Sequence, residues 1–129
     1  MFEYVDLRDK FEYVDLEDSW ILGWRFNGEQ RQIIFDIEAS LWEGHKFYTA
    51  PLPTEYTCYK LGRLIFNDVT SIKTLPEMEN VRPNVDMNNS LDYGNIEGFR
   101  EEKGTFKFEG YIGEVAIMCK GVTLEFPEK

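Results

Sequence analysis

Apolar and polar residues alternate on both sides of the dipeptide Asn27-Gly28. The apolar residues occupy even positions before it and odd positions after it: Trp20, Leu22, Trp24 and Phe26, then Ile33, Phe35, Ile37, Ala39 and Leu41. Alternation with a period of two is typical of a half-buried strand, and Asn-Gly favours a two-residue hairpin turn. Such a turn predicts a hairpin that sets Trp20 opposite Phe35 and places both apolar rows on one face. We expect Trp24 and Phe35 to lie in the core.

The C-terminal third shows the same alternation around three further turn sites, Lys103-Gly104, Ile112-Gly113 and Lys120-Gly121. Two-residue loops at these sites would pair Phe99 with Phe108, Phe108 with Ile117, and Ile117 with Leu124. All three turns place their apolar residues on one face. They predict a four-stranded antiparallel meander from about Tyr93 to Phe126.

The region between these two parts is less regular. Residues 58–66 predict a partly buried strand, and a turn at Asn67-Asp68 leads to an irregular edge strand over residues 69–75. Residues 76–89 are rich in proline, asparagine and acidic residues, which favour turns. The whole pattern predicts an all-β domain of seven to eight strands, arranged as an antiparallel β-sandwich or as a barrel.

The sequence FEYVDL occurs twice near the start of the chain, at residues 2–7 and again at 11–16. The offset of nine residues is odd, so the two copies cannot present the same face of one continuous strand. We therefore expect one copy to be dispensable. The prediction is a single domain over residues 1–129, with residues 1–10 as a peripheral N-terminal extension.

Composition and charge narrow the possible partners. The 129 residues are 43% hydrophobic and 16% aromatic, as in a folded protein, and the formal net charge is −10. That charge argues against nucleic acid or an anionic membrane as ligand and favours a basic protein. The chain shows no signal peptide or membrane span, so we expect a cytoplasmic protein. In that compartment Cys58 and Cys119, which lie in predicted strands, would be buried free thiols.

The long connection after the first hairpin is the best candidate for a binding site. It runs through EGHKFYTAPLPTEYT at residues 43–57 and holds the only histidine of the chain. Long loops rich in aromatic residues often carry function, and the candidate binding residues are Trp42, His45, Phe47, Tyr48 and Tyr56. The local sequence supplies neither a catalytic partner nor further metal ligands for His45, so an ordinary packed or solvated histidine is the alternative. We name no catalytic residue.

One stretch has the spacing of a calcium-binding loop. Five oxygen-bearing residues occupy its ligand positions 1, 3, 5, 7 and 12: Asp86, Asn88, Ser90, Asp92 and Glu97. Leu91 replaces the glycine that the sharp turn of such a loop needs, and no amphipathic helices flank the stretch. Turn formation by Asp and Asn side chains at a strand entry is the preferred explanation of these residues. We expect no metal and no cofactor.

The run from Leu16 to Trp42, together with CYKLGRLIF and DYGNIEGF downstream, resembles small bacterial all-β proteins. Some of these look like immunity proteins of polymorphic toxin systems. The resemblance implies a non-enzymatic protein-binding module that neutralises a basic toxin, and it carries no catalytic residues. Neither a phosphate-binding loop nor a nucleophile elbow is present, which also argues against an enzyme. The alternative is a small-ligand carrier, which needs an enclosed barrel cavity of roughly 300 Å³ or more.

Overall fold

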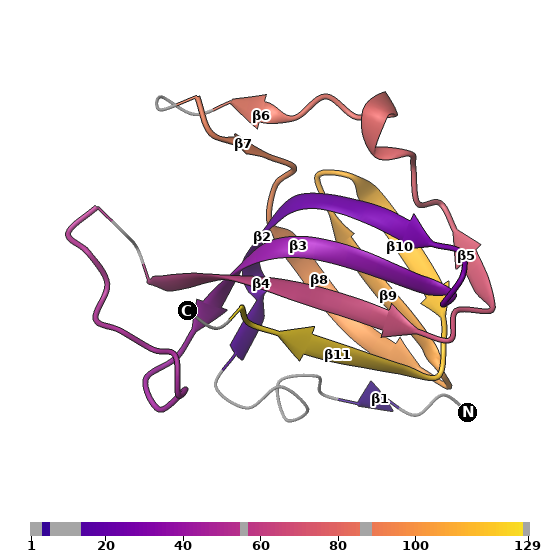
Figure 1. Ribbon diagram of the computed structural model, residues 1–129, viewed down its shortest axis with the longest axis horizontal. Coiled ribbons are helices and arrows are strands. Elements are labelled where there is room, and N and C mark those ends of the chain that lie inside the picture. Colours follow the sequence, from indigo (N-terminus) through magenta and orange to yellow (C-terminus); the bar gives the residue numbers. More distant parts are fainter. Residues whose placement is uncertain (1–3, 6–13, 55–56, 86–88, 128–129) are drawn as a thin grey trace.

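The structure is a computed structural model that describes residues 4–5, 14–54, 57–85 and 89–127 (Figure 1). Its elements in chain order are β1 (Tyr4–Val5), β2 (Val14–Asn27), β3 (Gln32–Leu41), β4 (Cys58–Asn67), β5 (Ser71–Lys73), the 3₁₀ turn η1 (Met78–Asn80), β6 (Asn84–Val85), β7 (Leu91–Asp92), β8 (Ile96–Glu102), β9 (Thr105–Gly110), β10 (Gly113–Met118) and β11 (Gly121–Glu125). Eight of these strands have three residues or more, in agreement with the predicted number.

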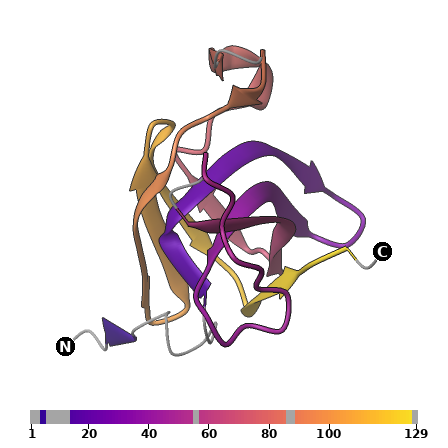
Figure 2. The same cartoon turned by 90° about the vertical axis from the view of Figure 1, so that its left-hand side faces the viewer.

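Two antiparallel sheets make up the body of the protein. One has the strand order β1-β8-β9-β10-β5 and the other the order β11-β4-β3-β2, while β6 and β7 form a small hairpin that projects from the body (Figure 1). Figure 2, a view turned by 90°, shows the two sheets as layers that face each other. The predicted all-β antiparallel sandwich is therefore confirmed. The described strands do not close into a barrel.

Phenylalanine rings fill the space between the two sheets. Phe66 of β4 lies within 6.4 Å, centroid to centroid, of four other rings: Phe35, Phe99, Phe106 and Phe108. Phe35 also packs edge to face against Phe108, which belongs to the opposite sheet, with 5.3 Å between the ring centroids. Edge-to-face and offset contacts are the favoured arrangements of aromatic rings. The core is thus built from residues that the alternation placed on the inner faces.

The first hairpin forms, but its register differs from the prediction. Asn27 pairs with Gln32, so the loop has four residues, and Trp24 rather than Trp20 lies opposite Phe35. The reason lies in the loop, where the Asn27 side-chain oxygen accepts a hydrogen bond from the Gln30 N–H at 3.3 Å and Arg31 takes a left-handed φ of 53°. The register moves by an even number of residues, and for that reason Trp24 still faces inward.

Irregularities in β2 change which of its side chains are buried. Between the pairs Asp15–Ser40 and Trp20–Glu38, four residues of β2 stand opposite Ala39 alone. The buried Ser19 hydroxyl closes this bulge, because it donates to the Asp15 carbonyl and accepts from the Ser40 N–H. A second shift follows between Ile21 and Gly23. As a result Ile21 is fully buried, whereas Trp20 and Leu22, two members of the predicted apolar row, are only half-buried. Phe26 lies beyond both shifts, next to the hairpin loop, and is exposed.

The predicted C-terminal meander holds for three strands and fails for the fourth. The turn at Lys103-Gly104 is correct: both residues have positive φ, as a type I′ turn requires, and Phe99 lies opposite Phe108. The next turn lies one residue earlier than predicted, at Tyr111-Ile112, which shifts the pairing by two residues, so Val115 rather than Ile117 faces Phe108. β11 crosses to the other sheet and pairs with β4, not with β10. Alternation shows which face of a strand is apolar. Because the inner faces of both sheets are apolar, β11 could join either sheet with its apolar side facing inward, and the pattern could not identify its neighbour.

Three further expectations concern the two cysteines, the N-terminal segment and a membrane-crossing helix. Cys58 and Cys119 are both buried and are not joined in a disulfide, as predicted. β1, which is part of the first FEYVDL copy, pairs with Glu101 and Glu102 at the edge of the five-stranded sheet, while the rest of residues 1–10 lies outside the described residues. No helix in the described part of the chain is long and apolar enough to cross a membrane.

Candidate functional site

The candidate site lies where β4 extends beyond its neighbour β11. On one side β4 pairs with β3 over residues 58–66, from Cys58 opposite Leu41 to Phe66 opposite Ile33. On the other side β11 pairs only with residues 63–67. Within the described part of the chain, no strand pairs with this outer edge of β4 at residues 60–62. An uncovered edge presents backbone donors and acceptors to its surroundings.

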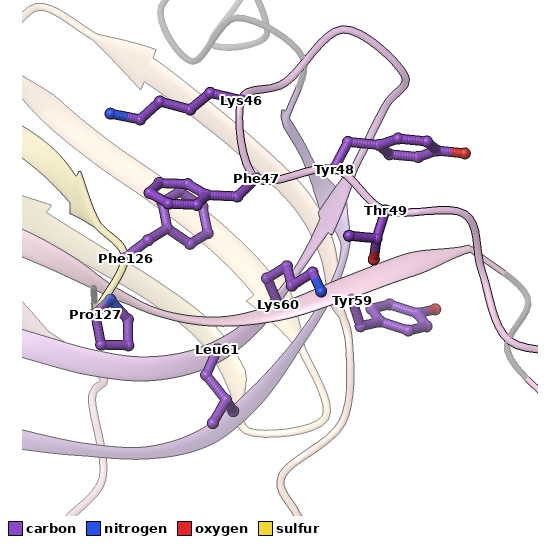
Figure 3. Close-up of a pocket in the computed structure, with 9 residues that line it drawn as sticks. All are labelled: Lys46, Phe47, Tyr48, Thr49, Tyr59, Lys60, Leu61, Phe126 and Pro127. Carbon is purple, nitrogen blue, oxygen red and sulfur yellow. The ribbon is translucent and has the colours of Figure 1, made fainter. Parts of the chain in front are cut away.

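An open groove of about 670 Å³ runs along this edge of β4 (Figure 3). Nine residues line it: Lys46, Phe47, Tyr48, Thr49, Tyr59, Lys60, Leu61, Phe126 and Pro127. They come from the loop after β3, from β4, and from the chain just beyond β11. The groove is therefore assembled from three segments that are far apart in the sequence.

Gly62 lets the chain after β11 pass close to β4. A Cβ atom at this position would lie 3.0 Å from the Glu125 carbonyl oxygen and 3.3 Å from the Phe126 ring. The Phe126 ring can therefore lie over Gly62 and form one end of the groove. Pro127 follows directly and has no N–H to donate, so β11 does not continue along β4.

His45 supports the groove from the loop side. Its backbone N–H donates to the Trp42 carbonyl at 3.2 Å, its carbonyl accepts from the Tyr48 N–H at 2.9 Å, and its Nδ1 accepts from the Phe47 N–H at 3.1 Å. The imidazole ring also lies 5.1 Å from the Phe126 ring. Since Nδ1 accepts a hydrogen bond, the neutral ring carries its proton on Nε2. Burial, and then the charge of Lys46, lower the pKa of His45 below its ordinary value.

The charge of the groove differs from that of the whole protein. Lys46 and Lys60 line it, whereas none of the nine lining residues is acidic. The Lys46 ammonium lies 5.0 Å above the Phe47 ring, and neither lysine forms an ion pair with a residue that the structure describes. The groove is thus apolar with two cationic groups at its walls, on a chain of net charge −10.

The structure brings together part of the predicted set of binding residues. Phe47 and Tyr48 line the groove, and His45 packs behind Phe126. Trp42 is exposed outside the lining set, and Tyr56 lies outside the described residues. Sequence reasoning missed the contribution of β4 and of the segment after β11. Leu61 gave no local signal, because an apolar residue in a predicted strand is expected to be buried, whereas the structure leaves its side chain exposed.

The calcium-loop pattern forms turns in the described residues. The Asp92 carboxylate accepts the Gly94 N–H at 2.9 Å and an Asn84 side-chain N–H at 3.3 Å, as expected of a residue that stabilises a turn. Asp86 and Asn88 lie outside the described residues. Among the residues that are described, no three His, Cys, Asp or Glu side chains are grouped so that they could hold a metal ion.

Comparisons with protein-family models, with curated proteins and with solved structures find no match to this chain. The geometry and the charge of the groove are therefore the features from which a function can be inferred.

Proposed function

We propose that this protein is a non-enzymatic protein-binding module and that the groove beside β4 is its contact site. The observation that carries the proposal is the groove itself, in which aromatic and aliphatic side chains border a strand edge with no strand partner at residues 60–62 among those described. Concave apolar sites with a few polar groups are typical of binding sites, and aromatic residues anchor many protein interfaces.

The net charge favours a basic partner, and the groove does not contradict this. A net charge of −10 acts over the whole surface and speeds the approach of a cationic protein, whereas two lysines act only on groups that enter the groove. An immunity protein that binds a basic toxin in the cytoplasm is the specific form of this proposal that the sequence resemblance implies.

The alternative of a small-ligand carrier finds less support. It depends on an enclosed cavity inside a barrel, but the described strands form two separate sheets, and the groove opens to solvent at the edge of one of them. Phenylalanine rings also occupy the space between the sheets.

The proposal is tested by capture from the native lysate with two matched variants. Leu61 in the groove and Val85 in the projecting hairpin are 61% and 62% exposed, so an aspartate at either position should leave the fold intact. We expect the wild type and Val85→Asp to capture the same basic protein, and Leu61→Asp to lose it. We also expect the association rate to fall as salt rises above about 0.1 M, where charges more than about 10 Å apart are screened. Equal capture by both variants, or an association rate that salt does not change, would contradict the proposal.

A further inference from the structure

We infer that the groove accepts one extended peptide segment of the partner, which adds as a strand to the outer edge of β4 and places a carboxylate side chain near Lys46 and Lys60. This inference rests on the proposed function and specifies how the partner is bound. It differs from a docking of two folded surfaces because it requires backbone hydrogen bonds to β4.

The first observation is the position of the groove relative to the β4 side chains. Tyr59, Lys60 and Leu61 are consecutive, and all three line the groove. Successive side chains of a strand point to opposite faces of the sheet, and in Figure 3 Lys60 and Leu61 leave the β4 ribbon on opposite sides. A single groove can touch both faces only if it follows the edge between them. The space is therefore in line with the sheet, where a further strand would lie.

The second observation is the state of this edge. The last pair between β11 and β4 is Glu125 with Arg63, and the chain turns away at Phe126 and Pro127. An incoming segment would continue the place of β11 along residues 60–62, a length of roughly 10 Å at about 3.3 Å per residue. In an antiparallel pair, alternate residues of the added strand direct their N–H and C=O groups to the neighbouring strand. Addition of a strand to an exposed sheet edge is a common mode of peptide recognition.

The third observation is the chemistry of the walls. Phe47, Leu61 and Phe126 offer apolar contact to alternate side chains of the segment, and the two ammonium groups of Lys46 and Lys60 favour a carboxylate. A carboxylate that reaches either ammonium gains a charge-assisted hydrogen bond, whereas a basic side chain would be repelled. The preferred segment therefore combines apolar residues with at least one acidic residue, whatever the charge of the rest of the partner.

Lysines on strand edges have a second use, which the experiment must separate from the first. A charged side chain at an edge can discourage the pairing of two copies of a protein. If Lys46 and Lys60 only protect the edge, no peptide of either charge binds, and this result would overturn the inference.

The probe is the acetylated and amidated peptide FEYVDL, and the control is its charge-reversed form FKYVKL. FEYVDL combines apolar and aromatic residues with acidic residues at its second and fifth positions, which place one carboxylate on each face of an added strand. Its copy at residues 11–16 contributes Val14–Leu16 to β2. In an NMR titration of the full chain, we expect FEYVDL to shift amide signals of residues 46–49, 59–62 and 126, with FKYVKL about tenfold weaker or more. The double variant Lys46→Glu/Lys60→Glu should reverse this preference. Equal binding of both peptides by the wild type would contradict the role of the lysines.

Backbone pairing is tested with two N-methylated forms of FEYVDL, one methylated at residues 1, 3 and 5 and the other at residues 2, 4 and 6. Because only alternate N–H groups of an added strand face β4, we expect one form to lose binding by about tenfold or more and the other to bind like the parent. If both forms bind like the parent, strand addition is wrong. Capture of a basic partner that depends on Leu61 would still support the proposed function in that case, so the two ideas can fail separately.

Discussion

Trp24 and Phe35 are Cα partners across β2 and β3, and their ring centroids lie 6.1 Å apart. The Trp24 ring also meets Tyr93 edge to face at 5.0 Å, and its indole N–H donates to the Pro76 carbonyl at 2.9 Å. One buried side chain therefore connects the first hairpin to the long segment between β5 and β8.

Truncation of either ring should destabilise the protein strongly. Trp24 and Phe35 are 7% and 1% exposed, so Trp24→Ala or Phe35→Ala should lower the free energy of unfolding by about 3–5 kcal/mol. Phe26→Ala is the matched control, since its ring is 58% exposed on the same strand as Trp24, and it should cost under about 1 kcal/mol. Urea unfolding measures all three. A Trp24→Ala variant as stable as Phe26→Ala would contradict the packing described above.

The inner faces of the sheets were the most predictable part of the fold. All five alternating residues of β3, from Ile33 to Leu41, are buried as the pattern indicated. The pairing registers were less predictable, because a turn may gain two or four residues without changing which face of the strand is apolar. The first bulge of β2 is held by the Ser19 hydroxyl, which accepts a hydrogen bond from the Ser40 N–H of the neighbouring strand, and no local pattern encodes that contact.

The candidate site was predictable only on its loop side. Phe47 and Tyr48 stood out as aromatic residues in a long loop, and both line the groove. The other wall of the groove contains Lys60, Leu61 and Phe126. These residues line it because the pairing of β11 with β4 ends at Arg63, the neighbour of Gly62, and this end point depends on two strands that are distant in the sequence. Local alternation gives the length of each strand but not the length over which two strands pair, so this half of the site needed the structure.

Removal of residues 1–9 should have little effect on stability. In the described part of this segment, only the two-residue strand β1 pairs with the body, and it does so at the edge of the sheet. We expect a truncation to cost under about 1 kcal/mol. The two copies of FEYVDL supply a matched pair: Leu16→Ala, at a 4% exposed position, should cost about 2–5 kcal/mol, whereas Leu7→Ala should be nearly silent. A loss of several kcal/mol on truncation would show that the first copy is required.

Asp18 should make the stability depend on pH. Burial, followed by repulsion from Asp15, raises the pKa of Asp18 above its ordinary value of 3.8. A raised pKa in the folded state means that this contribution to stability is complete below pH 3.8 and is lost as the pH rises through the folded-state pKa. Asp18→Asn should therefore raise the melting temperature at neutral pH and leave it unchanged near the acid limit. A lower melting temperature for this variant at neutral pH would contradict the assignment.

His45 should report on the charge at the groove. It is the only histidine of the chain, so its ring signals can be followed by NMR without ambiguity. Its pKa is lowered first by burial and then by Lys46, so we expect a titration midpoint below 6.5. Lys46→Gln removes only the smaller cause, and the midpoint should rise but stay below 6.5. The matched control is Lys120→Gln, a lysine outside the groove, which should leave the midpoint unchanged.

The lowered pKa of His45 also determines how its contribution to stability changes with pH. A lowered pKa in the folded state means that the contribution of His45 is present above 6.5 and declines as the pH falls below that value, because the unfolded chain then binds the proton more readily. Melting temperatures of the wild type and His45→Gln should therefore converge as the medium becomes acidic. A His45 midpoint above 6.5 in the wild type, or one that Lys46→Gln lowers, would contradict the placement of the Lys46 ammonium beside this ring and with it the cationic wall of the groove.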